Sequence, residues 1–66
     1  MKITLNGREK ELTGPQNLGE VIGRFCRNTA HVIAEINGDI VRPPQWDQVM
    51  IKEGDTIELL NFVGGG

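Results

Sequence analysis

Polar and apolar residues alternate near the start of the chain, and this period of two is typical of a half-buried strand. Lys2-Ile3-Thr4-Leu5 shows the alternation, and Asn6-Gly7 follows as a hairpin signal because both residues tolerate a positive φ. Residues 8–12 predict a return strand, whose run of Glu and Lys side chains suits the edge of a sheet. The start of the chain therefore predicts a β-hairpin.

The same signals recur in the second half of the chain. Residues 32–36 predict a strand, Asn37-Gly38 a second hairpin turn, and residues 39–41 a short return strand. Pro43-Pro44 ends that strand, because proline has no N–H to donate to a sheet. A second β-hairpin is therefore expected here.

Between the two hairpins the apolar period lengthens to that of an amphipathic helix. The predicted apolar face consists of Leu18, Val21, Ile22 and Phe25. Asn17 can cap the helix, and Glu20 can reach back to it as in a capping box. We expect the helix to end near Arg27-Asn28.

The remaining segments complete one small domain. Residues 46–51 predict an irregular segment or a brief strand, and residues 56–63 predict the longest strand. The elements together predict an α+β fold with one helix on one sheet, spanning residues 1–63, followed by a flexible glycine tail at residues 64–66. The predicted core consists of Ile3, Leu5, Val21, Ile22, Phe25, Ile57 and Leu59. Trp46 is expected to close the end of this core.

Composition excludes several classes of function. The 66 residues carry a net charge of −2, one Cys and one His. Cys26 and His31 are too few for the roughly four ligands of a structural zinc site, so no metal is expected. Lys and Arg form no long cluster and no apolar run approaches the roughly 18 residues of a membrane helix, which argues against nucleic acid and membranes as partners. We expect a cytoplasmic protein that is monomeric when free.

The chain closes on three glycines, Gly64-Gly65-Gly66, directly after the last predicted strand. Glycine has no side chain, so such a segment can enter a narrow channel in a partner. A terminal carboxylate is ionised near neutral pH and is a poor electrophile, and joining it to AMP would create a good leaving group. The sequence offers no catalytic triad, phosphate loop or metal cluster for that reaction, so another protein would have to catalyse it.

The chain resembles the thiamine-biosynthesis sulfur carriers, a family of bacterial ubiquitin-like proteins, over essentially its whole length. The resemblance rests on Met1-Lys2-Ile3 opening a strand, Asn37-Gly38-Asp39-Ile40-Val41 before a proline, Gln45-Trp46-Asp47, Gly54-Asp55 and the terminal Gly65-Gly66. The family often has alanine before the last two glycines, where this chain has Gly64. The resemblance implies a β-grasp fold, in which a mixed sheet curls around one helix.

The resemblance also implies a function. An activating enzyme that uses ATP would adenylate the carboxylate of Gly66, sulfur derived from cysteine would convert it to a thiocarboxylate, and thiazole synthase would take that sulfur to form the thiazole ring of thiamine. The chain itself would be a co-substrate, not an enzyme, and would bind no cofactor.

On this interpretation Gly64, Gly65 and the preceding Leu60, Phe62 and Val63 bind the partner enzymes. Leu60 and Phe62 are expected on the face of the sheet that the helix leaves open, where apolar side chains form a docking surface. The alternative for Phe62 is local packing under Trp46.

Two other functions remain open from the sequence. One is a sulfur carrier of another pathway, such as the small subunit of molybdopterin synthase, whose tail chemistry would be the same. The other is a ubiquitin-like modifier that forms isopeptide bonds.

Overall fold

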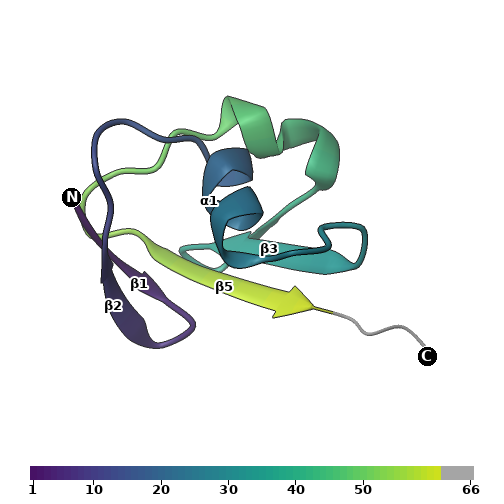
Figure 1. Ribbon diagram of the computed structural model, residues 1–66, viewed down its shortest axis with the longest axis horizontal. Helices are drawn as coiled ribbons and strands as arrows, with labels where there is room; N and C mark the ends of the chain where they lie inside the picture. The colour runs from purple at the N-terminus through teal and green to yellow at the C-terminus, as the bar shows by residue number, and fades with distance from the viewer. Residues whose placement is uncertain (62–66) are drawn as a thin grey trace.

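The computed structural model describes residues 1–61, which form one sheet with a helix and a short 3-10 helix on the same face (Figure 1). The elements in chain order are β1 (Lys2–Leu5), β2 (Arg8–Glu11), α1 (Leu18–Phe25), β3 (Val32–Ile36), β4 (Asp39–Val41), η1 (Pro43–Gln48) and β5 (Thr56–Asn61). The predicted order of strands and helix is confirmed. The predicted tail at residues 64–66, and the last two residues of the predicted final strand, lie outside the described residues.

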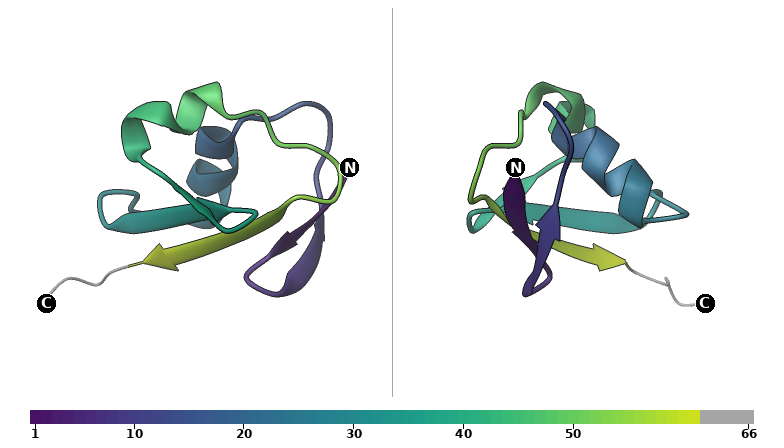
Figure 2. Two further views of the ribbon diagram at one scale, coloured as in Figure 1. Left: turned by 180° about the vertical axis from the view of Figure 1, so that it is seen from behind. Right: turned by 60° about the vertical axis from the view of Figure 1, so that its left-hand side comes forward.

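The strands follow the order β2-β1-β5-β3-β4 in a single sheet. β5 lies in the middle, parallel to β1 on one side and antiparallel to β3 on the other. β2 and β4 are the antiparallel edge strands. This is the mixed sheet on one helix that the sequence and the resemblance led us to expect. Figure 2 shows that α1 and η1 cover one face of the sheet and leave the other open.

Both Asn-Gly pairs form tight hairpin turns as predicted. The φ angles are 50° at Asn6 and 79° at Gly7, and 52° at Asn37 and 90° at Gly38. Positive φ at both central residues is the geometry of a type I′ turn, whose twist matches that of the flanking strands. The two turns therefore set the register of both hairpins.

The predicted capping box of α1 is confirmed. The Asn17 side chain accepts the N–H of Glu20 at 2.8 Å, and the Glu20 side chain accepts the N–H of Asn17 at 2.9 Å. The helix ends at Phe25, earlier than the predicted end near residues 27–28. Cys26 already has extended backbone angles, φ −125° and ψ 130°, although its N–H still donates to the carbonyl of Ile22.

The expectation of an irregular segment or brief strand at residues 46–51 is wrong for residues 46–48 and holds for residues 49–51, which are irregular apart from an isolated β-bridge between Met50 and Asn17. Residues Pro43–Gln48 form the 3-10 helix η1, and the two prolines that end β4 also stand in its first turn. Proline suits this place because its fixed φ fits a helix and its missing N–H has no partner there in any case. Trp46 is buried, and its Nε1–H donates to the carbonyl of Val41 at 2.8 Å. Its predicted role in closing the core is confirmed.

The buried core lies between the sheet and the two helices. It consists of Ile3, Leu5, Leu12, Leu18, Val21, Ile22, Val32, Ala34, Trp46, Ile51, Ile57 and Leu59. Six of the seven predicted core residues are among them, and Phe25 is the exception.

The prediction that Phe25 is buried is wrong, since its exposed fraction is 36%. Phe25 is the last residue of α1 and lines a groove beside Arg8 and Lys10 of the edge strand β2. Long charged side chains at an edge do not form a dry cover over an aromatic ring. The helical period correctly placed Phe25 on the apolar face of α1. It does not show how far the core extends across the sheet toward the edge strand β2.

The two glycines in α1 give a matched pair of variants. A Cβ atom placed at Gly23 has no neighbour within 4 Å, whereas one placed at Gly19 would collide with Oδ1 of Asp47 and lie 3.3 Å from Oδ1 of Asn17. Gly23→Ala should raise the free energy of unfolding by about 0.8–1 kcal/mol, the difference in helix propensity. Gly19→Ala should raise the free energy of unfolding by clearly less, because the side chains of Asp47 and of the helix cap Asn17 must move.

Urea denaturation followed by circular dichroism measures both free energies. An equal gain in the two variants would show that Asp47 does not restrict position 19.

Candidate functional site

Most of the predicted site lies at the end of the chain. Phe62, Val63, Gly64, Gly65 and Gly66 are outside the described residues, and of the predicted site residues Leu60 alone is described. The structure therefore describes the site only up to β5, the strand that directly precedes those residues in the sequence. β5 crosses the middle of the sheet and ends on the side of the molecule opposite the N-terminus (Figure 1).

β5 is paired along most of its length on one side and at its start on the other. On one side β3 pairs with it from Ile36↔Ile57 to Val32↔Asn61. On the other side β1 pairs at Thr4↔Thr56 and Leu5↔Ile57, after which the chain turns away at Asn6.

The Asn6 side chain replaces the missing strand beyond that point. Its Oδ1 accepts the N–H of Leu59 at 2.8 Å, and its Nδ2 donates to the carbonyl of Leu59 at 3.3 Å. The backbone N–H of Asn6 donates to the carbonyl of Ile57 at 2.9 Å. One amide group thus satisfies both main-chain groups of Leu59, and it holds β5 close to the point where the predicted tail begins.

A second asparagine fixes the start of β5. Asn37 accepts the N–H of Thr56 at 2.9 Å through Oδ1, and it donates to the Asp55 carboxylate at 3.0 Å through Nδ2. Asp55 is buried, and its other carboxylate oxygen accepts the N–H of Lys52 at 2.7 Å. Sequence reasoning missed these roles of Asn6 and Asn37, because an Asn-Gly pair already has a sufficient explanation as a turn.

Leu60 lies on the open face of the sheet as predicted, with an exposed fraction of 57%. Its neighbour across the strands is Ile33, which is half-buried, and Ile40 on β4 adds a further side chain with an exposed fraction of 67%. We call Ile33, Ile40 and Leu60 the open-face patch. Register places Glu35 and Glu58 opposite each other on the same face, so two carboxylates border the patch.

The other chemically interesting side chains lie apart from one another. Cys26 is half-buried at the end of α1, and His31 is exposed in the loop before β3. Among residues 1–61 there is no group of three or more His, Cys, Asp or Glu side chains that could hold a metal ion. No helix in this part of the chain is long and apolar enough to cross a membrane.

Sequence comparison connects this arrangement with known proteins. A family model described as the ThiS family matches residues 3–66. The sulfur carrier protein ThiS of Escherichia coli is 29% identical, and the match covers all of both chains. A thiazole synthase of Paramagnetospirillum magneticum is 30% identical over all of this chain, which spans only 20% of that protein's length.

Structural comparison gives the same family. The crystal structure of the thiamine biosynthesis protein ThiS from Geobacter metallireducens matches with a TM-score of 0.82 and 32% sequence identity, covering all of both chains. The β-grasp fold expected from the resemblance is confirmed by this match together with the sheet order.

The bonds between Asn6 and Leu59 can be tested separately from the turn. Asn6→Gly keeps the positive φ and removes only the side-chain amide. We expect the free energy of unfolding to fall by about 1–2 kcal/mol, since two partly buried hydrogen bonds are lost. Amide hydrogen exchange at Leu59 should accelerate more than at Leu60, because the main-chain groups of Leu60 face β3 and not Asn6.

NMR-detected exchange measures both amides in one sample. Unchanged protection at Leu59 in Asn6→Gly would show that the Asn6 side chain does not hold β5.

Proposed function

The chain belongs to the ThiS family, and on that premise we propose that it is the sulfur carrier of thiamine biosynthesis, with the carboxylate of Gly66 as the sulfur-bearing group. The observation that carries the proposal is the match with the E. coli sulfur carrier, which runs over the whole of both chains and so includes Gly66. The same match favours thiamine biosynthesis over molybdopterin synthesis, whose carrier would use the same tail chemistry, and over protein modification through isopeptide bonds.

The proposed reaction has two steps, both catalysed by an activating enzyme. A carboxylate oxygen of Gly66 attacks the α-phosphorus of ATP, pyrophosphate leaves, and a mixed anhydride with AMP forms. A sulfur donor at the oxidation level of sulfide then attacks the carbonyl carbon and displaces AMP. The product is a thiocarboxylate in which one oxygen has been replaced by sulfur.

The chain contributes presentation, not catalysis, to these steps. A tail of Gly64, Gly65 and Gly66 carries no side chains, so it can enter a narrow active site without steric conflict. β5, the strand that precedes the tail in the sequence, is held by hydrogen bonds on both flanks, which fixes the direction of β5 relative to the rest of the surface. ATP belongs to the activating enzyme, and the carrier holds no cofactor of its own.

Thiazole synthase is the proposed acceptor of the sulfur. The thiazole synthase of P. magneticum contains a stretch similar to all of this chain, and this supports a working relation between the two kinds of protein. We further propose that the carrier acts in the cytoplasm and is monomeric when free.

The open-face patch is the proposed docking surface for the activating enzyme. Leu60 exposes apolar area two residues before Phe62 and three before Val63, so an enzyme that receives the tail would also cover the patch. Glu35 and Glu58 beside the patch would favour a partner surface with Lys or Arg at its rim.

The role of Gly66 can be tested by intact mass. After co-expression with the activating enzyme and a sulfur source, the wild-type chain should gain the mass difference between sulfur and oxygen. Deletion of Gly66 should abolish that gain while thermal unfolding stays unchanged, since residues 1–61 contain the whole described core. Gly64→Ala is the matched control and should still gain sulfur, because it leaves the carboxylate and the final two glycines intact.

A deletion variant that still carried sulfur on its new terminus would refute the assignment of Gly66.

The role of the patch can be tested with Leu60→Ser. Truncating a central interface residue commonly weakens binding by about 1–2 kcal/mol, so the KM of the activating enzyme for the carrier should rise by about 5–30-fold. Met50→Ser is the control, because Met50 has a similar exposed fraction of 51% but follows η1, on the helix side of the molecule. Equal KM values for the two variants would exclude Leu60 from the docking surface.

A further inference from the structure

A second surface with a different character lies on the helix side of the molecule. The register of β2 pairs Arg8 with Leu5 and Lys10 with Ile3, so both cations project to the face that carries the core. They line a groove of about 600 Å³ between β2 and the end of α1. The sequence shows no cluster of cations here, because β2 and the helix end are far apart along the chain.

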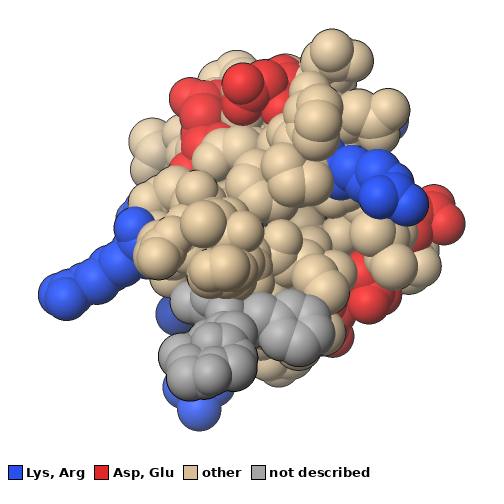
Figure 3. Space-filling view, turned by 90° about the vertical axis from the view of Figure 1, so that its right-hand side faces the viewer, with Lys and Arg blue, Asp and Glu red and all other residues tan. Residues whose placement is uncertain are grey.

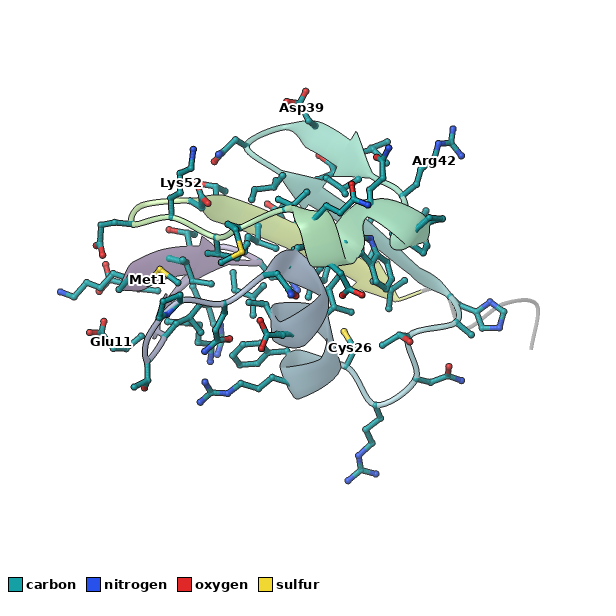
Figure 4. All side chains as sticks on the ribbon, turned by 90° about the horizontal axis from the view of Figure 1, so that it is seen from above. Met1, Glu11, Cys26, Asp39, Arg42 and Lys52 are labelled. Atoms are coloured by element: carbon teal, nitrogen blue, oxygen red, sulfur yellow. The ribbon has the colours of Figure 1, made fainter. Side chains whose placement is uncertain are left out.

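The exposed Phe25 lies in this groove between cations. The Lys10 ammonium is 5.9 Å and the Arg24 guanidinium 5.3 Å from the centre of its ring. Arg27 follows the helix and also lines the groove. We call Arg8, Lys10, Arg24, Phe25 and Arg27 the basic groove. Figure 4 shows the labelled Cys26 at this end of α1, with Asp39 and Arg42 on the opposite side of the molecule.

The cations of the groove have no carboxylate partner within residues 1–61. The ion pair in this part of the chain joins Lys2 to Glu9 at 4.0 Å, both on the open face. The groove gathers four of the seven Lys and Arg residues, namely Arg8, Lys10, Arg24 and Arg27, although the net charge of the chain is −2. Seen from the side on which β5 ends, Lys and Arg appear at the left, below and at the upper right, and Asp and Glu lie at the top and right (Figure 3).

Helix stabilisation accounts for only part of this arrangement. Cations in the last turn of a helix interact favourably with its dipole, and this is a sufficient reason for Arg24. It gives no reason for Arg8 and Lys10, which come from a strand. Bringing several like charges together around an exposed aromatic ring lowers stability by mutual repulsion unless a ligand of opposite charge compensates it.

We propose that the basic groove binds an acidic segment of thiazole synthase, the enzyme left without an assigned surface once the open-face patch is given to the activating enzyme, and this inference rests on the proposed function. The floor of the groove is apolar, formed by Leu5, Phe25 and Leu59, and the cations stand around it. That pattern fits carboxylates flanking an apolar side chain. Arg8 and Lys10 stand two residues apart on one strand face, about 7 Å, which is the spacing of alternate side chains in an extended segment.

The position of the groove connects it with the tail. Asn6 and Leu59 line it, and these are the residues whose hydrogen bonds hold β5 near its end. An enzyme that receives the tail can therefore reach the groove from the helix side while the open-face patch remains on the other side of the sheet. The acidic open face and the basic groove favour partner surfaces of opposite charge, so the two surfaces discriminate between partners.

The test uses the double charge reversal Arg8→Glu with Lys10→Glu in the full chain. Lys2→Glu with Lys52→Glu is the matched control, since it changes the net charge equally at exposed positions outside the groove. For the activating enzyme and for thiazole synthase, KM for the carrier is measured at low and at high salt. We expect the groove variant to raise KM at least about tenfold with thiazole synthase, and the control to leave it within about twofold. The difference should shrink as salt screens the charges.

The intact mass of each carrier variant is also measured after reaction at a saturating concentration of the activating enzyme. Normal sulfur loading of the groove variant, together with its raised KM, would support the inference. A wild-type KM of the groove variant with thiazole synthase would overturn it. If the wild-type chain itself gains no sulfur, the proposed function is refuted. The groove then has no assigned partner either, and this result differs from a groove variant that keeps its KM.

Discussion

The main-chain pairing of β5 with the strands on either side of it is the interaction on which the rest of the structure depends. β5 is the strand that joins the two hairpins into one sheet, through parallel pairing to β1 and antiparallel pairing to β3. The parallel contact is short, covering Thr4↔Thr56 and Leu5↔Ile57. Side-chain amides at both hairpin turns add to the pairing of β5: Asn6 bonds to Leu59 on the β1 side, and Asn37 bonds to Thr56 on the β3 side. Two turn residues therefore also hold the central strand.

This arrangement explains how a chain of 66 residues holds β5, the strand that precedes its last residues, in a defined direction. A small domain has little apolar area to bury, so its stability depends on satisfying main-chain groups as well as on the core. The core face of β5 contributes Ile57 and Leu59, and its other face carries Glu58 and Leu60 to solvent. One strand thus anchors the fold and leads to the residues proposed to carry sulfur.

Several residues behind the family resemblance are structural. Asn37 joins the second hairpin to β5, Asp55 is buried in hydrogen bonds at the start of β5, and Trp46 closes the core. The proposed chemistry resides in the last residue, and the residues that make the family recognisable mainly build the scaffold that presents it. The open-face patch and the basic groove are the surfaces proposed to bind partner enzymes. They lie on different sides of the sheet because the scaffold places them there.

The sequence by itself determined the order of the strands and the α-helix, both hairpin turns, the capping box and six of the seven predicted core residues, because period and turn chemistry are local properties. It also placed Leu60 on the open face, since alternation along a strand fixes the face once the core face is known. Tertiary structure decided what depends on distant partners. It left Phe25 exposed because the core ends before the edge strand, turned residues 43–48 into a helix around the buried Trp46, and brought the cations of β2 beside those of α1. Those outcomes depend on which segments pack together across the sheet, and the local sequence pattern carries no information about that packing.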